Sequence, residues 1–198
     1  ISRWTMAYFS ASLVFLLAAL ATLGSGFGLP LAIPATPDTL VVIHLVAIGW
    51  LGLLFCGALL QFVPVLAATH LRLPWLAAPA LLSLTSGLAL LLVGFLALEG
   101  RVNIDPSVVS VGGLLLGTGF LLLGISLGAT LLAQWTFGIS NVLVLCGLSA
   151  LAITVATGNL FAGLLSGVID QPALAAALPG LAPHHAAAGA LGWMTMTA

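Results

Sequence analysis

The stretch SVVSVGGLLLGTGFLLLGISLGATLLA, residues 107–133, decides the fold class of this chain. It contains no charged side chain, and it exceeds the roughly 20 apolar residues that an α-helix needs to cross a membrane. Gly113, Gly117, Gly124 and Gly128 recur within it at intervals of four and seven residues. Because small residues let helix backbones approach closely in lipid, this spacing predicts a transmembrane helix packed against other helices.

The composition of the whole chain points to lipid as its main solvent. Of the 198 residues, 62% are hydrophobic and 4% are charged, whereas soluble domains carry about 25% charged residues. Three basic and four acidic side chains cannot cover a particle of this size in water. So few basic residues also exclude nucleic-acid binding, which requires many phosphate contacts. We therefore expect an integral membrane protein in a lipid bilayer.

Apolar stretches like residues 107–133 recur along the sequence. The expected fold is an all-α, polytopic transmembrane helix bundle with five complete spans and a sixth at the carboxyl terminus. Residues 1–198 are expected to form a single transmembrane domain, because no linker divides them. The first residue is Ile1 and the last apolar stretch has no polar flank, so we expect a piece of a longer chain. The expected spans cover residues 5–23, 39–66, 74–98, 107–133, 139–166 and 183–198.

The charged residues set the expected orientation of these spans. Arg3 precedes the first span, and Arg72 lies between the second and the third. Arg101 is the only basic residue in the alternate connections, which hold all four acidic residues. Since basic residues accumulate on the cytoplasmic side of membranes, the amino terminus is expected to be cytoplasmic.

Histidines are the residues in the expected spans that suggest a site. No Asp, Glu, Lys or Arg lies deep in a span, which argues against an ion-driven transporter or a carboxylate-based pump. His44 lies about one and a half turns inside the second span, and His184 and His185 begin the sixth. Both spans descend from the outer side, so similar depths are expected. Two helices that present imidazoles at one level can hold haem or a metal ion. His70, beside Arg72 in a connection, is expected to be solvated.

Helical geometry favours His185 over His184 as the ligand. At about 3.6 residues per turn, His185 shares a face with Gly189 and Gly192. A strip of glycine next to an imidazole is expected to leave room for a flat macrocycle. The face of His184 carries bulkier side chains.

Two short motifs resemble the haem-copper oxidase subunit I superfamily. The run HLVAIGW (44–50), followed by a glycine-containing stretch that ends at Pro64, resembles the second helix of that superfamily. The run HHAAAGALGW (184–193) resembles a sixth-helix segment of its small, divergent members. It also repeats the His…Gly-Trp pattern of the second span. In topology the resemblance covers most of the chain.

This resemblance implies that His44 is an axial ligand of a b-type haem, and that His185 or His184 binds haem or a metal such as copper. It implies a respiratory-chain oxidoreductase in the bacterial inner membrane, with a cytochrome or quinol as electron donor and other membrane subunits as partners. The His-Pro/Glu-Val-Tyr pattern and the proton-channel acids of the oxygen-reducing members are absent from the sequence. The resemblance therefore extends equally to relatives that handle nitric oxide, such as nitric oxide reductase-like subunits or NnrS-type proteins.

The residues leave three functions open. The first is a membrane-embedded haem protein, with or without copper, that binds or reduces a small gas such as O2 or NO. The second is a permease for a neutral solute, since Pro64 and the glycine-rich spans allow helix breaks. The third is a structural or assembly subunit whose histidines only make hydrogen bonds. The sequence does not decide whether the chain is an enzyme.

Overall fold

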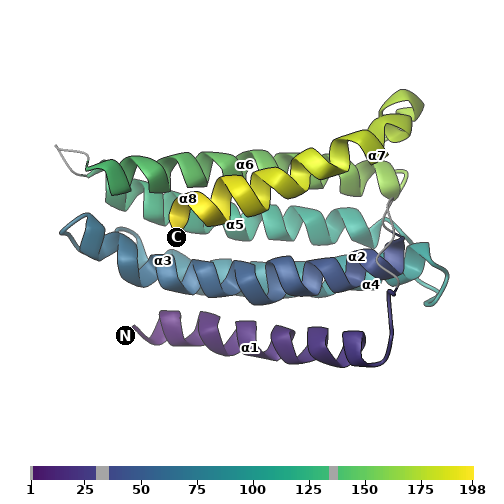
Figure 1. Ribbon diagram of the computed structural model, residues 1–198, viewed down its shortest axis with the longest axis horizontal. Coiled ribbons are helices and arrows are strands. Elements are labelled where there is room, and N and C mark those ends of the chain that lie inside the picture. Colours follow the sequence, from purple (N-terminus) through teal and green to yellow (C-terminus); the bar gives the residue numbers. More distant parts are fainter. Residues whose placement is uncertain (1, 30–35, 134–137) are drawn as a thin grey trace.

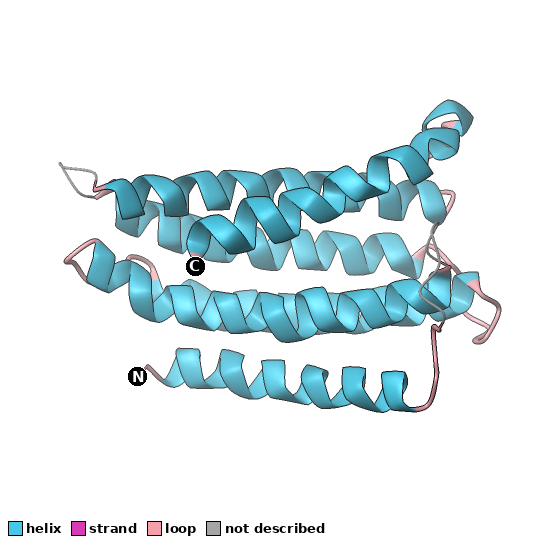
Figure 2. Ribbon diagram, viewed as in Figure 1, coloured by secondary structure: helices cyan, strands magenta, loops and turns pink. Residues whose placement is uncertain are grey.

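The computed structural model describes residues 2–29, 36–133 and 138–198, and every regular element in these residues is a helix. The predicted all-α fold class is thus confirmed for the described residues (Figure 2). The helices run side by side along one axis, with α1 at one side and α6 at the other, and η3 and α8 pack on α6 (Figure 1). The elements are α1 (Arg3–Gly24), α2 (Pro37–His44), the π-helix η1 (Leu45–Gly52), α3 (Leu53–Leu66), the short 3₁₀-helix η2 (Pro74–Leu76), α4 (Ala77–Leu98), α5 (Val108–Leu132), α6 (Ile139–Leu165), α7 (Pro172–Ala187), the π-helix η3 (Ala188–Met194) and α8 (Thr195–Thr197).

Five helical segments are long and apolar enough to cross a membrane. α2, η1 and α3 form one of them without interruption, and η2 and α4 form another. Their ends agree with those of the first five predicted spans to within two residues. The five segments are Arg3–Gly24, Pro37–Leu66, Pro74–Leu98, Val108–Leu132 and Ile139–Leu165.

The sixth helical segment begins earlier than predicted. We expected a connection over residues 167–182, but α7 already starts at Pro172 and continues through Pro179 and Pro183. Proline at the first helical position costs no hydrogen bond, because that N–H has no partner in the helix. The residues around the two inner prolines are mainly alanine and leucine, which have the highest helix propensities. In this segment the helix propensity of the alanine and leucine residues outweighs the helix-breaking effect of Pro179 and Pro183.

Glycines bring α4 and α5 closest together. A Cβ atom on Gly112 would lie 2.5 Å from the backbone nitrogen of Leu91, and one on Gly87 would lie 2.7 Å from that of Leu116. The predicted packing role is confirmed for Gly113 and Gly117, which lie against Asn159 of α6. It is wrong for Gly124 and Gly128, since nothing lies within 4 Å of a Cβ at either position.

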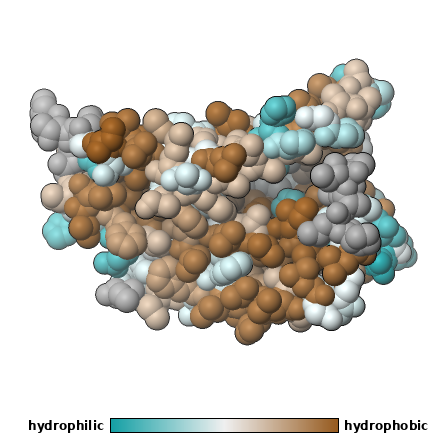
Figure 3. All heavy atoms as spheres, viewed as in Figure 1, coloured by the Kyte–Doolittle hydropathy of each residue, from teal (hydrophilic) through white to brown (hydrophobic). Residues whose placement is uncertain are grey.

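The outer surface of the bundle suits a lipid environment. Large apolar side chains such as Val14, Leu82 and Leu114 are more than half exposed. Hydrophobic residues cover most of the middle of the face seen in Figure 3. The segments therefore have both the length and the surface of an integral membrane protein.

The charged residues of the described chain gather at the two ends of the bundle. We call the end that holds the start of α1 and the connection from α3 to η2 the amino-terminal end, and the other the opposite end (Figure 1). The amino-terminal end carries Arg3 and Arg72 and no acidic residue among those described. The opposite end carries Asp38, Glu99, Arg101, Asp105 and Asp170.

Candidate cofactor site

His44 is the last residue of α2 and lies in the second membrane-spanning segment. Its Nδ1 atom lies 2.8 Å from the carbonyl oxygen of Leu40, one turn earlier. A carbonyl oxygen can only accept, so Nδ1 carries the proton and donates it. The ring of Phe95 from α4 packs beside the imidazole, with 5.1 Å between ring centroids. These two contacts fix both the tautomer and the orientation of the half-buried ring.

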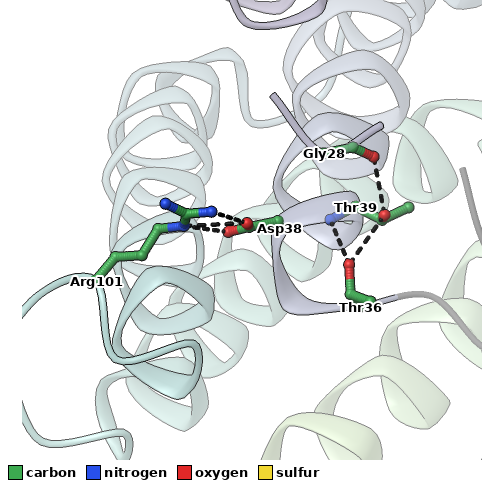
Figure 4. A network of polar contacts seen from close by, with 5 residues as sticks. All are labelled: Gly28, Thr36, Asp38, Thr39 and Arg101. Carbon is green, nitrogen blue, oxygen red and sulfur yellow. Dashed lines mark hydrogen bonds and ion pairs between the residues drawn. The ribbon is translucent and has the colours of Figure 1, made fainter. Parts of the chain in front are cut away.

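A polar network at the opposite end fixes the start of α2, and with it the position of His44 (Figure 4). Nε of Arg101 donates to both carboxylate oxygens of Asp38, at 2.8 and 3.0 Å, and Nη2 adds a third contact. The hydrogen bonds to Asp38 raise the pKa of Arg101. Thr36 caps the helix by accepting from the Thr39 N–H, and the Thr39 hydroxyl donates to the carbonyl of Gly28. Hydrogen bonds thus hold the connection from α4 to α5 and the residues after α1 against the start of α2.

His185 lies in α7 and packs on α6. Its Nδ1 atom lies 3.0 Å from the hydroxyl oxygen of Thr157. That hydroxyl donates its own proton to the α6 carbonyls of Ile153 or Thr154, at 2.9 and 3.0 Å, so it accepts from Nδ1–H. A Cβ atom on Gly158 would lie 2.9 Å from Cε1 of the imidazole. The glycine therefore provides the space in which the ring lies.

His44 and His185 lie on different helical segments, and the charge of His185 is only a minor part of the electrostatic environment of His44. In both rings Nδ1–H is donated to an acceptor inside the protein. Nε2 of His44 has no hydrogen-bond partner among the described residues, and the His185 ring also interacts with the backbone carbonyl of Thr154. A neutral imidazole of this tautomer has its lone pair on Nε2. Metal-binding histidines are held in the same way, with the other ring nitrogen donating to a fixed acceptor. The lone pair on Nε2 of each ring is therefore available to coordinate a metal ion.

A π-helix follows both histidines. η1 begins directly after His44 and contains Gly49 and Trp50, and η3 begins three residues after His185 and contains Gly192 and Trp193. The sequence pattern His…Gly-Trp thus corresponds to the same local structure in both segments. π-helical turns are rare and are frequently found at functional sites.

The prediction that Gly189 and Gly192 leave room for a macrocycle beside His185 is wrong, because the helix is a π-helix at these residues. Faces drawn with 3.6 residues per turn do not continue into η3, where each turn is wider. A Cβ on Gly189 would lie 3.2 Å from Thr154, and one on Gly192 would lie 2.7 Å from Ala150. Both glycines therefore lie against α6 and bring the helices together, and they do not leave room for a macrocycle.

The other two histidines lie outside this arrangement. His184 is exposed, and its ring makes no hydrogen bond to a described residue. His70 is exposed in the connection between α3 and η2, at the amino-terminal end. Exposure of His70 agrees with its expected solvation. Of the neighbouring pair in α7, His185 is the one with fixed partners in the bundle.

The donor set limits what the pair can hold. Within the part of the chain that the structure describes, no three His, Cys, Asp or Glu side chains lie close enough to bind one metal ion. A copper ion at His184 and His185 would need further ligands. Haem iron needs only one or two axial ligands from the protein, and two neutral imidazoles meet that need. By number of ligands alone, the pair meets the need of haem iron and falls short of that of a bare metal ion.

Trp193 is a residue of this region that the sequence analysis did not assign to the site. Its indole is 3% exposed and lies between Phe55 of α3 and Phe120 of α5, with ring centroids 6.2 and 5.5 Å away. Its Nε1–H is buried without a hydrogen-bond partner among the described residues. The repeated Gly-Trp pattern marks this tryptophan in the sequence, but its burial depends on how η3 rotates. Trp193 anchors the sixth helical segment to the rest of the bundle.

Comparison with protein-family models, with curated proteins and with solved structures finds no match for this chain. The fold and the site themselves define its class. The described residues form an all-helical integral membrane protein in which two half-buried imidazoles are held on different helical segments.

Proposed function

We propose that the protein is a membrane-embedded haem protein in which His44 and His185 ligate the haem iron through Nε2. The observation that carries this proposal is the matched state of the two rings. Each donates Nδ1–H to an internal acceptor, so the lone pair of each neutral ring lies on Nε2. Hydrogen-bonded imidazoles with no ligand would more often use both nitrogens, because an unpaired polar atom inside a membrane is costly.

The residues around the rings have defined tasks in this proposal. Leu40 and Thr157 hold the imidazoles in one tautomer, and hydrogen bonds of this kind increase the basicity of a ligand. Phe95 and Phe161, whose ring lies 5.5 Å from that of His185, provide apolar walls that exclude water. Bound haem would supply one-electron chemistry or the binding of a small gas such as O2 or NO. The resemblance of the two His…Gly-Trp segments to haem-copper oxidase subunit I-like proteins supports the same proposal.

The cellular setting forms a second part of the proposal. We place the amino terminus in the cytoplasm, because Arg3 and Arg72 share one end of the bundle. We take the segment from Pro172 to Thr197 as a sixth span and the bacterial inner membrane as the location. A cytochrome or quinol would supply electrons, and other membrane subunits or copper would complete the site.

A visible absorption spectrum of the detergent-purified protein tests the haem. We expect a Soret band that weakens or shifts in His44→Ala and in His185→Ala, since each change removes an axial ligand. His184→Ala is the matched control, because it removes the adjacent, exposed imidazole and should leave the band unchanged. Iron and copper contents, measured on the same samples, separate haem loss from loss of a copper ion.

Two results would reject the proposal. Protein that folds and purifies normally without iron or copper would point to a structural subunit or a permease for a neutral solute. A larger effect on bound metal in His184→Ala than in His185→Ala would reject the assignment of His185.

A further inference from the structure

The amino-terminal end of the bundle contains a groove that is remote from the histidine pair. Its volume is about 700 Å³, and it lies between the start of α1 and the end of α3, beside the connection that follows α3. Ser2, Gln61 and His70 contribute polar groups to its lining, and Leu60, Pro64 and Val65 contribute apolar ones. The backbone N–H of Ser2 donates to Oε1 of Gln61 at 3.4 Å, which links the two helices across the groove. The groove is therefore amphipathic and lies where a membrane surface meets water.

Two arginines, Arg3 and Arg72, are sequence neighbours of residues that line this groove. The guanidinium of Arg3 lies 4.9 Å from the ring centroid of Trp4, and Trp4 lines the groove. Arg72 is exposed, two residues after His70. Neither arginine has an acidic partner among the described residues, whose one ion pair joins Arg101 and Asp38 at the opposite end. Two uncompensated positive charges beside a groove favour an anionic ligand.

The connection that carries Arg72 is held in an unusual backbone conformation. Ala68 and Leu73 both have positive φ, 42° and 52°, which L-residues with a Cβ atom adopt rarely. Two buried hydroxyls of α5 hold this conformation: Thr130 accepts from the Arg72 N–H at 2.8 Å, and Ser126 donates to the Arg72 carbonyl at 2.6 Å. These bonds fix the backbone of Arg72, and its exposed side chain remains available to a ligand.

We propose that this groove binds the headgroup of an anionic phospholipid from the surrounding leaflet. The phosphate would lie between the arginines at Arg3 and Arg72, with hydroxyl, amide and imidazole groups of the groove as further partners. The groove is open toward lipid, since Val65 in its lining is 70% exposed. Phe62, one turn away and 61% exposed, extends the apolar path for an acyl chain. Basic pockets between membrane helices bind anionic lipid headgroups by this combination of charge and apolar contact.

Native mass spectrometry or lipid titration of the purified full chain tests this site, with phosphatidylglycerol and phosphatidylcholine as probes. We expect phosphatidylglycerol to bind more tightly than phosphatidylcholine. In Arg3→Gln/Arg72→Gln, the affinity for phosphatidylglycerol should fall roughly 10- to 30-fold, from about 1 kcal/mol per arginine near the surface. Excess inorganic phosphate should not displace the lipid, because it lacks the acyl chains.

The matched control removes Arg101 at the opposite end together with its partner Asp38, so that no unpaired carboxylate remains. Asp38→Asn/Arg101→Gln should bind phosphatidylglycerol like the unmodified protein. The single variant Arg72→Gln keeps the backbone bonds to Ser126 and Thr130, so it remains usable if the double variant does not fold. Equal affinity for the two lipids, equal loss in the control, or displacement by inorganic phosphate would overturn the proposal.

Discussion

At the scale of single residues, most hydroxyls inside the bundle are satisfied within their own helix. The side chains of Thr22, Thr85 and Thr154 each donate to the carbonyl four residues earlier, at 2.9–3.1 Å. Threonine can make this bond without a tertiary partner, which suits a residue surrounded by lipid. Thr157 makes the same kind of bond and in addition accepts from His185. That second contact is what distinguishes it from the others.

Gly158 provides a test of how His185 is held. Gly158→Ala would place a methyl group 2.9 Å from Cε1 of His185, so the ring must move and the bond to Thr157 is strained. We expect a loss of about 1–3 kcal/mol in the free energy of unfolding, the usual cost of overpacking. Thermal unfolding in detergent measures this loss, and the visible spectrum shows whether the ring has moved.

Gly124→Ala is the control for that substitution, because nothing lies within 4 Å of a Cβ at this position in α5. It should be neutral or stabilise the protein by up to about 1 kcal/mol, since alanine is the better helix former. If both variants unfold at the same temperature as the original protein, His185 is not confined by Gly158.

The two main residues of the candidate site could be chosen from the sequence, whereas their partners could not. His44 and His185 are marked because an imidazole in an apolar stretch is unusual. Leu40 acts through its carbonyl, which every residue has, and Thr157 resembles other threonines of the same helix. Which threonine meets His185 depends on the rotation of α6 and α7, and this rotation follows from packing that no local pattern records.

At the scale of elements, the start of α2 depends on a glycine that precedes it. Gly28 has φ +71°, and a Cβ atom there would lie 2.8 Å from the carbonyl oxygen of Asp38. Its own carbonyl accepts from Thr39. The residues after α1 can therefore approach α2 this closely only with glycine at position 28.

Gly28→Ala should consequently disturb the first turn of α2. We expect a loss of about 1–3 kcal/mol from the strained backbone alone, and a further loss from the contact with Asp38. Gly26→Ala is the matched control, because Gly26 also has positive φ (+77°) but nothing lies within 4 Å of its Cβ. The difference in unfolding temperature between the two variants isolates the close approach. Equal shifts would mean that Asp38 moves aside without cost.

Element boundaries show where sequence patterns succeed and fail in this chain. The first five spans follow from long apolar runs closed by polar or proline-containing connections, and these patterns fix the ends to within two residues. α7 begins eleven residues before the predicted sixth span, because its alanine-rich sequence continues the helix through Pro179 and Pro183. The π-helices η1 and η3 have no distinct hydrophobic period of their own, so only the structure reveals them.

At the scale of the whole molecule, the distribution of charge gives the bundle two unlike ends. The amino-terminal end holds two arginines beside an amphipathic groove, and the opposite end holds four acidic residues and one arginine that is paired with Asp38. The proposed lipid site requires the first of these ends to face an anionic leaflet surface. The positive-inside rule and the lipid proposal therefore agree on the same orientation.

Cysteine labelling in intact cells and in permeabilised cells tests this orientation. Asn103→Cys places a thiol on the exposed connection between α4 and α5, and His70→Cys places one in the exposed connection after α3. We expect a membrane-impermeant maleimide to label Asn103→Cys in intact cells and to label His70→Cys only after permeabilisation. The native Cys56 and Cys146 lie within membrane-spanning segments, so the unmodified protein should stay unlabelled in both conditions. If only His70→Cys were labelled in intact cells, the bundle would have the opposite orientation. Arg3 and Arg72 would then face the outer side.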